Sequence, residues 1–434
     1  MSVTVIPRVV RSVAQPLGLY FRVGHNDHTT LSSLLAQGQR AYFGIVIEAS
    51  RAGRQRELIR EAEQARLECI LDPCTQAAAT VGGYAEKFES LPWALGRRPT
   101  VLDFELEAGK NLVLSIAEFA VEHHFSQVLA PTHFVSCADD RWLDADIENT
   151  SALREHLDRR GGKAVDVIYS LCLPYAVFRD EAQREAIVSK LERRLHAQSV
   201  WLRVSGCGSD STATAVRNYI NACRDFHHLA VPLVADQMGG LPGLALLALS
   251  SMGGIATGLA VSERFSAAHW LRSSQGGAFM AHPRVYLPSV DLYLAQKEAR
   301  ALFDLDARIK GHFGCHDREC CPRGLDDMLA KPARHFAVQR IRQISELSQI
   351  PASLRANVFL DDYVRPMTDH ALRLAKVRGL DAKVQGRIDK HRHRLDMVRV
   401  MLGKLVELKQ ASSNARIPST RTMREGEAVG RLQR

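Results

Sequence analysis

The sequence predicts an α/β fold, a (β/α)8 TIM barrel followed by a zinc knuckle and a helical C-terminal extension. Between residues 17 and 261, short segments that are apolar on both faces alternate with amphipathic segments. This alternation is typical of a parallel sheet covered by helices. Eight such strands in about 245 residues fit a closed barrel better than a doubly wound open sheet, which is the alternative.

The predicted strands are bounded by turn residues and separated by helical patterns. We expect strands at 17–24, 42–50, 68–73, 127–135, 166–173, 199–206, 231–237 and 253–261. Helices are expected at 28–38, 52–66, 111–124, 150–160, 180–196, 211–224 and 241–250, with a long excursion at 74–110. No Gly-x-Gly-x-x-Gly follows the first strand, so a dinucleotide-binding fold has no support.

The chain divides into a barrel (1–300), a zinc-binding segment (301–350), a basic helical extension (351–410) and a disordered basic tail (411–434). The sequence changes character over 264–310, where SSQGGAF (273–279) and HPRVYLPSVDLY (282–293) predict loop and short strand. The chain reads as helical from 333 onward. Apolar residues at three-four spacing over 377–405 fit a coiled coil, a homodimer or partner-protein contact, or a helix docked on the barrel; we favour docking.

Composition narrows the class of protein. Hydrophobic residues make up 46% of the 434, as in soluble globular proteins, and the longest apolar runs are too short to span a bilayer. The N-terminus lacks the apolar core of a signal peptide, so we expect a cytoplasmic protein without a membrane partner. A net charge of +9 favours a polyanion, nucleic acid above all, without choosing between DNA and RNA.

A cluster of thiols follows the last predicted strand. Cys315, Cys320 and Cys321 fall within seven residues, and His335 comes fourteen residues after the last of them. Zinc favours thiolate and imidazole ligands in a tetrahedral shell. We therefore predict a structural Zn2+ held by these four residues, with His312 and His316 as alternative ligands. A shell closed by four protein ligands has no open position for catalysis.

Active sites of such barrels lie at the C-terminal ends of the strands. Asp72 and Asp236 stand there, and we predict a nucleophile and a general acid/base; the alternative is that they cap the following helices. Gly239 and Gly240 would let a flat ligand approach backbone amides. The other polar residues at predicted strand ends are His25, Asn26, Asp27, Glu48, Thr132, His133, Ser205 and Gln237.

A barrel, a cysteine-rich knuckle, a returning histidine and a helical tail together resemble the tRNA-guanine transglycosylase superfamily, over roughly residues 17–350. The superfamily includes relatives that place 7-deazaguanines in DNA. ECILDPCTQAAA offers Asp72 and Gln76 where the family has Asp-Ser-Gly-Gly-Phe-Gln, and GGLPGLA offers Gly239 and Gly240 where it has Gly-Gly-Leu-Ala-Val-Gly-Glu. Cys-x4-Cys-Cys replaces the family's Cys-x-Cys-x-x-Cys.

The resemblance implies exchange of guanine in tRNA or DNA for a 7-deazaguanine base through a carboxylate nucleophile. It implies a catalytic role for Asp72 and a base pocket that includes Gln76 and the two glycines; Asp236, Ser205 and Gln237 join them by their positions at strand ends. The family carries its nucleophile at the end of the eighth strand, where GGIATGLAVSERF has only Glu263 nearby, so Asp236 or Glu263 would have to replace it. Two alternatives follow. One is a non-catalytic nucleic-acid-binding or partner subunit, and the other is a barrel enzyme with a catalytic zinc.

Overall fold

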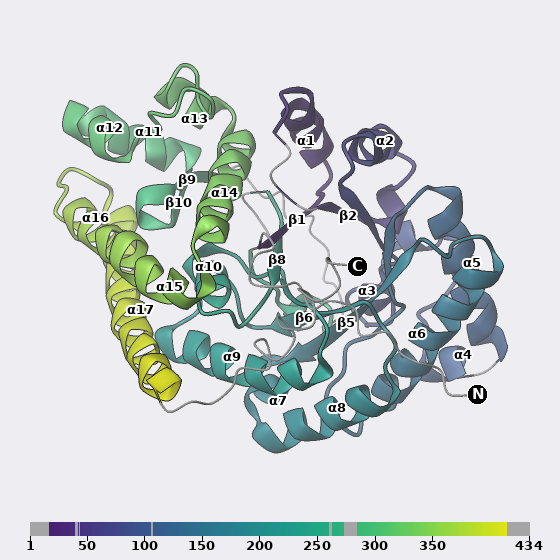
Figure 1. Cartoon of the computed structure of the whole chain (residues 1–434). Helices are drawn as coiled ribbons and strands as arrows, with labels where there is room; N and C mark the ends of the chain where they lie inside the picture. The colour runs from purple at the N-terminus through teal and green to yellow at the C-terminus, as the bar shows by residue number, and fades with distance from the viewer. Residues whose placement is uncertain are drawn as a thin grey trace, which may run out of the picture.

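The computed structural model describes residues 17–39, 42, 44–105, 107–259, 263–272 and 284–414. Within them, eight parallel strands close into a barrel, and β1 pairs with β8 through Gly18 opposite Gly254 (Figure 1). This confirms the predicted fold class. The strands are β1 (Gly18–Arg22), β2 (Gly44–Glu48), β3 (Glu68–Asp72), β4 (Gln127–Leu129), β5 (Asp166–Pro174), β6 (Ser199–Ser205), β7 (Leu233–Asp236) and β8 (Gly254–Thr257).

Helices follow the strands and form the outer ring. They are α1 (Asp27–Ala36), α2 (Arg56–Gln64), α3 (Thr75–Ala78), α4 (Val101–Glu105), α5 (Glu107–Glu122), α6 (Arg141–Arg159), α7 (Tyr175–Arg179), α8 (Glu181–Arg194), α9 (Ala213–Phe226) and α10 (Gly240–Ala248). Two predictions were wrong in extent. The excursion 74–110 contains α3, α4 and the start of α5, and α6 is nearly twice as long as the predicted 150–160.

The barrel is followed by a small antiparallel ribbon, β9 (Arg284–Leu287) and β10 (Leu292–Ala295), and by helices. The helices are α11 (Gln296–Leu305), α12 (Ala307–Phe313), α13 (Leu325–Ala330), α14 (Pro332–Gln349), α15 (Ala352–Val358), α16 (Arg365–Ala375) and α17 (Ala382–Asn414), with a π-helical turn, η6 (Phe359–Val364), before α16. Five 3-10 turns complete the described elements: η1 (Ala49–Arg51), η2 (Glu86–Phe88), η3 (His227–Leu229), η4 (Ala267–His269) and η5 (Pro288–Val290). The short strands expected within 282–293 are confirmed by β9 and by the start of β10, whereas 273–279 lie outside the described residues. Helices α11 and α12 were not predicted.

The extension gathers on one flank of the barrel, where α17 packs against α9 and α16 (Figure 1). This is the docked-helix arrangement that the apolar spacing predicted. Because α17 runs to Asn414, the first four residues of the predicted disordered tail are helical, and 415–434 lie outside the described residues. Among the described helices, none combines the length and apolarity that a membrane span requires.

Side chains inside the barrel form layers. One layer is apolar, with one residue from each strand: Tyr20, Val46, Ile70, Leu129, Ile168, Trp201, Val234 and Ala256. Since side chains of a strand return to the same face every second residue, the next inward positions toward the C-terminal ends are Arg22, Glu48, Asp72, Ser170, Arg203 and Asp236. The barrel thus changes from apolar to charged in a single step along its axis.

Candidate functional site

Four side chains form a charged layer at the C-terminal end of the barrel: Arg22, Asp72, Arg203 and Asp236. Arg22 donates to Asp236 through Nε (2.6 Å) and Nη2 (2.7 Å), and to Asp72 through Nη1 (2.7 Å). Arg203 donates to Asp236 through Nε (2.8 Å) and lies 3.3 Å from Asp72 through Nη2. Two positive and two negative groups therefore balance in a largely buried site.

Gln76 joins this charged layer to two neighbouring strands. Its Oε1 accepts from Arg203 at 2.5 Å. Its Nε2 donates to the Thr132 hydroxyl at 2.9 Å and to the Ser170 hydroxyl at 3.0 Å. Of the predicted site residues, Asp72, Gln76, Thr132 and Asp236 are therefore brought together around the barrel axis. A buried amide with its hydrogen-bonding groups satisfied in this way holds its neighbours in one geometry.

The two aspartates are ionised at neutral pH. Burial opposes ionisation, but the charges of Arg22 and Arg203 outweigh it and lower the pKa of Asp72 to about 2. The same balance lowers the pKa of Asp236. A carboxyl group held in this state accepts hydrogen bonds and can attack an electrophile. It does not serve as a proton donor near neutral pH, so the arrangement favours the nucleophile role over the general-acid role.

The backbone after each aspartate is unusual. Cys74 and Gln237 both have left-handed conformations, with φ of 64° and 55°, and the Cys74 N–H donates to Asp72 at 2.9 Å. Non-glycine residues in this region carry strain, which clusters at functional sites. The Asp72 side chain is 11% exposed and that of Asp236 is fully buried, so Asp72 is the more accessible carboxylate.

Gly239 and Gly240 lie at the N-terminus of α10, and a side chain of the protein occupies the space beside them. A Cβ at Gly239 would overlap the carboxylate of Glu263, and Gly240 has a φ of +61° that suits glycine. Glu263 accepts from the Gly240 N–H (3.1 Å), the Tyr293 hydroxyl (2.6 Å) and Arg340 (2.9 Å). The space expected for a flat ligand therefore holds a side chain of this protein.

Glu263, Asp291 and Arg340 together form what we call the carboxylate clasp. Asp291 accepts from the Leu241 N–H at 2.6 Å, and the buried Arg340 of α14 lies between the two carboxylates. Burial raises the pKa of Glu263 against the opposing charge of Arg340. The clasp links α14 to the barrel. Both oxygens of Glu263 are occupied by these contacts, which indicates a structural role and not that of a nucleophile.

The remaining predicted pocket residues lie outside the charged layer. The Ser205 hydroxyl accepts from the Ala267 N–H, and Gln237 is half-buried. Glu48 pairs with Lys87, and exposed His25 contacts Arg54. His133 is buried, and its Nδ1 lies 2.6 Å from Asp146 while its ring stacks on Trp142. Asn26 and Asp27 begin α1, where Asp27 accepts from the Gly24 N–H.

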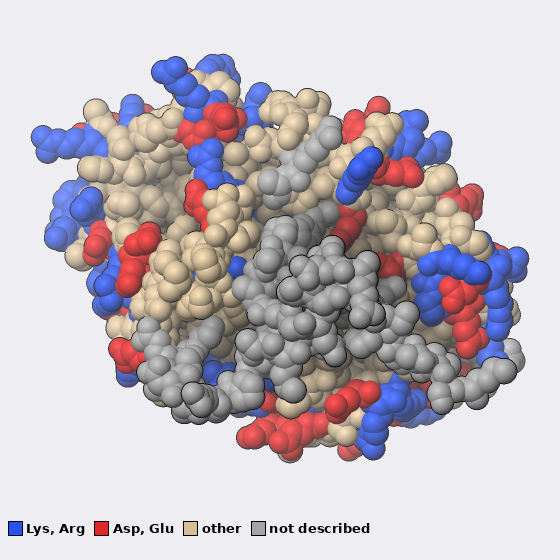
Figure 2. Space-filling model, in the orientation of Figure 1, with Lys and Arg blue, Asp and Glu red and all other residues tan. Residues whose placement is uncertain are grey.

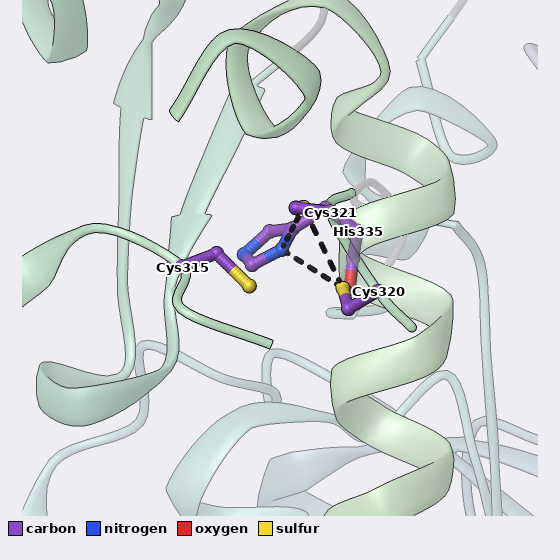
Figure 3. A group of neighbouring side chains, drawn as sticks. All are labelled: Cys315, Cys320, Cys321 and His335. Atoms are coloured by element: carbon purple, nitrogen blue, oxygen red, sulfur yellow. Dashed lines mark hydrogen bonds between the residues drawn. The ribbon is translucent and has the colours of Figure 1, made fainter. Parts of the chain in front are cut away.

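The cysteine cluster has the geometry of a metal site. Sγ of Cys315, Cys320 and Cys321 and the His335 ring nitrogen all lie within 4.8 Å of one another, and all four residues are buried. Figure 3 shows these side chains turned toward a common centre, with His335 at the start of α14. The described cysteines form no disulfides. His312 and His316, the alternative ligands, are not members of this cluster.

The distances fit a tetrahedral zinc ion. Zinc–sulfur bonds of about 2.3 Å and zinc–nitrogen bonds of about 2.0 Å place ligand atoms roughly 3.5–3.8 Å apart. Cys320 and Cys321 have sulfurs 3.7 Å apart, and Nδ1 of His335 lies 3.3 and 3.4 Å from them. Nε2 of His335 donates to the Tyr286 carbonyl at 3.0 Å, which leaves Nδ1 deprotonated and free to bind a metal.

Basic residues are distributed over the surface and not confined to one patch. On the face shown in Figure 2, Lys and Arg project mainly at the outer edge near α12 and α16 and on the opposite side near α5, with Asp and Glu interspersed. The turn between α16 and α17 and its flanks expose the cations Arg373, Lys376, Arg378, Lys383 and Lys390.

Sequence reasoning missed Arg22 and Arg203, the two cations of the charged layer. Each lies within a strand whose other inward residues are apolar. A guanidinium inside a buried parallel strand requires a carboxylate partner, because an unpaired buried charge is very unfavourable. The presence of two arginines within predicted strands and of two aspartates at strand ends is the sequence signal that predicts these ion pairs.

Comparisons with known proteins give only weak likenesses to solved structures. No protein-family model matches the chain, and no curated protein matches it. Similar solved structures include an endo-1,4-beta-xylanase of Penicillium canescens (11% identity, TM-score 0.38, covering 56% of this chain and 81% of that one). A putative phosphonomutase from Burkholderia cenocepacia (15%, 0.31, 56% and 87%) and a chitinase from Pseudoalteromonas aurantia (12%, 0.36, 58% and 95%) are also similar. Likenesses this weak carry no argument about activity.

Proposed function

We propose that the chain is a transglycosylase-like enzyme that exchanges a guanine in nucleic acid for a 7-deazaguanine base. The observation that carries the proposal is the pair of ionised carboxylates, Asp72 and Asp236, held at the C-terminal end of the barrel by two arginines. Glycosidic exchange requires a carboxylate that attacks a sugar carbon without first losing a proton. The resemblance of the sequence supplies the substrate class.

Asp72 is the nucleophile in this proposal, because its carboxylate is the more exposed of the two. One oxygen forms a bond to C1′ as the C1′–N9 bond of the guanosine breaks, and the leaving guanine takes up a proton from water. The incoming base then forms a new bond to C1′ as the bond to Asp72 breaks, and its N–H proton passes to water, so that protons balance over the exchange. Asp236 positions Arg22 and Arg203 and does not react.

Both oxygens of Asp72 are hydrogen-bonded in the structure, one to the Cys74 N–H and one to Arg22 and Arg203. Attack therefore requires that Arg22 turn away from Asp72. A substrate phosphate offers the guanidinium an alternative partner of the same charge as the carboxylate. Binding of the polyanion would in this way free the nucleophile.

The Cys3His cluster would hold a structural zinc ion. Its four protein ligands would fill the coordination shell, so its role is to fix the knuckle and the start of α14. The exposed cations around the α16–α17 turn, including Arg373, Arg378 and Lys383, support a polyanionic partner, tRNA or DNA. A homodimer or partner protein is not required by these contacts.

A second candidate is a non-catalytic nucleic-acid-binding or partner subunit on the same barrel. Two observations favour it. Every carboxylate oxygen of Asp72 and Asp236 already has a donor, and the Gly239 surface is covered by Glu263. In that case the charged layer would serve stability alone.

Base exchange tests the proposal. Zinc-loaded protein is incubated with tRNA or duplex DNA that carries radiolabelled guanine, and label release is followed after free 7-deazaguanine is added. We expect release with wild type and none with Asp72→Asn, while Asp158→Asn, a change in an exposed ion pair of α6, should match wild type. An Asp72-linked sugar adduct, detected by mass spectrometry, would identify the nucleophile.

Absence of release from either polymer, in folded and zinc-loaded wild type, would refute catalysis. Retained binding of the polymer, with an affinity that falls steeply as salt rises, would then favour the binding subunit. Release that is unchanged in Asp72→Asn would show that another group attacks C1′.

A further inference from the structure

A short segment that follows β8 lies across the C-terminal end of the barrel; we call residues 263–272 the strap. Its side chains alternate, with Phe265 and Ala267 buried and Arg264 and Ala268 exposed. The Phe265 ring lies 5.8 Å from the guanidinium carbon of Arg203. Phe265 and Ala267 also pack on Cys172, which β5 presents toward the strap. The strap therefore covers the charged layer on the side of Arg203.

Hydrogen bonds to neighbouring loops show where the strap runs. The Gly206 N–H donates to the Phe265 carbonyl at 2.9 Å, just after β6. The Ala267 N–H donates to the Ser205 hydroxyl at 2.8 Å. The Gly82 N–H, in the excursion after β3, donates to the Trp270 carbonyl at 2.7 Å. The strap thus runs from the side of β6 and β7 across the barrel to the loop that follows β3.

The two ends of the strap are held very differently. At its start, Glu263 belongs to the carboxylate clasp, and its carbonyl accepts from the N–H groups of Ser209 and Gly239. At its far end, the Gly82 N–H donates to the Trp270 carbonyl, the Trp270 ring packs on Phe265, and the carbonyl groups of His269 and Arg272 lie close to Gly82. Leu271 and Arg272 are exposed. Buried ion pairs thus hold the start, whereas the described contacts of the far end are backbone hydrogen bonds and packing, so we expect the far end to move before the start does.

We infer that the strap is a hinged cover that opens about Glu263 and controls access to the charged layer. Opening breaks the Gly82–Trp270 bond and lifts Phe265 from Arg203, while the clasp stays closed. Arg203 then meets solvent or a ligand, and Arg22 and Asp72, which are already 11% exposed, become more accessible. This inference does not rest on base exchange, because it concerns access to the layer whichever ligand binds there.

The thiol of Cys172 reports opening directly, since it is fully buried beneath Phe265 and Ala267. Full-length native protein is treated with N-ethylmaleimide, and modification of each cysteine is followed over time by peptide mass spectrometry. Cys223 of α9 is the internal reference, because it is equally buried and belongs to a different part of the core. Its modification measures unfolding of the barrel and not movement of the strap.

Gly82→Ala is the opening variant. The added Cβ would overlap the carbonyl oxygens of His269 and Arg272, so the far end of the strap must leave its place. We expect Cys172 to react about tenfold faster with Cys223 unchanged, since losing one net hydrogen bond shifts a local opening equilibrium by roughly that factor. Gly53→Ala is the control, because nothing lies within 4 Å of its added Cβ.

Trp270→Ala is the second variant and removes the ring contact to Phe265 from the same end. It should accelerate Cys172 in the same selective manner. Unchanged reaction of Cys172 in both variants would overturn the inference. Equal acceleration of Cys172 and Cys223 would overturn it as well, because the barrel as a whole would then be opening. The readout requires no enzymatic activity, so it fails or succeeds independently of base exchange.

Discussion

Asp236→Asn tests whether the charged layer is an ion-paired network on which the barrel depends. The Asp236 side chain is fully buried, and it accepts two hydrogen bonds from Arg22 and one from Arg203. Asparagine has nearly the same shape, so the substitution leaves no cavity. It leaves two guanidinium groups facing the single carboxylate of Asp72, and the layer changes from neutral to positive.

Removing one partner of a buried ion pair typically costs 3–5 kcal/mol, because the remaining charge stays buried without compensation. Two arginines lose a partner here, so we expect a loss of about 4 kcal/mol in the free energy of unfolding. Urea denaturation at pH 7, followed by circular dichroism, measures it. Asp158→Asn changes a half-exposed ion pair with Arg154, and should cost less than about 1 kcal/mol.

Arg22→Met added to Asp236→Asn restores one charge of each sign, and should recover part of the lost stability. An Asp236→Asn variant as stable as Asp158→Asn would refute the reasoning, since it would mean that Asp236 is not the compensating charge for Arg22 and Arg203. A double variant less stable than Asp236→Asn alone would refute the charge-balance argument in particular.

Three further predictions concern pH and metal. The folded-state pKa of Asp72 (about 2) lies below the unfolded value near 3.9. Ionised Asp72 therefore contributes about 2 kcal/mol to the free energy of unfolding above pH 4, and this contribution is lost as pH falls toward 2. Asp72→Asn should flatten this part of the stability–pH curve. Burial, reinforced by the charge of Arg394, lowers the pKa of His391 to about 4. The free energy of unfolding should therefore fall as pH drops from about 6.5 to 4, because the unfolded state takes up a proton first. Urea denaturation at several pH values should show that His391→Gln removes this dependence. Cys321→Ser should abolish stoichiometric zinc binding, measured by metal analysis, and lower the melting temperature, measured by calorimetry. Cys137→Ser, which lies outside the cluster, should change neither quantity. Retained zinc in Cys321→Ser would exclude Cys321 as a ligand.

The sequence predicted the barrel because the signal for it is local. Each strand is apolar on both faces, and every observed barrel strand lies within its predicted range except β5, which extends one residue further, to Pro174. The helices that were not predicted lie where tertiary packing decides the structure. Residues 296–313 form α11 and α12, whose buried faces consist of a few residues such as Leu302, Phe303 and Phe313 within a charged sequence. The short α3 and α4 likewise carry too few residues to show a helical period.

Some residues of the candidate site could likewise be predicted from the sequence, and others could not. The metal cluster could be predicted because three of its four members lie within seven residues, and a closed shell requires them to converge. Asp72, Gln76 and Asp236 could be placed at one end of the barrel by strand order. That Glu263 fills the space beside Gly239 could not, since the contact joins residues 24 positions apart, with α10 and β8 between them, and Glu263 is also held by Arg340 of α14.

These contacts also connect the metal cluster to the strap. His335 and Arg340 lie five residues apart on α14; the first is a predicted ligand, and the second holds Glu263, the root of the strap. Tyr286 bridges them, because its carbonyl accepts from His335 and its hydroxyl donates to Asp291 of the clasp. A bound metal that fixes the start of α14 would therefore also fix the hinge about which the strap turns. This gives a physical reason for a metal-stabilised knuckle after the last strand in a protein whose charged residues lie at the barrel mouth.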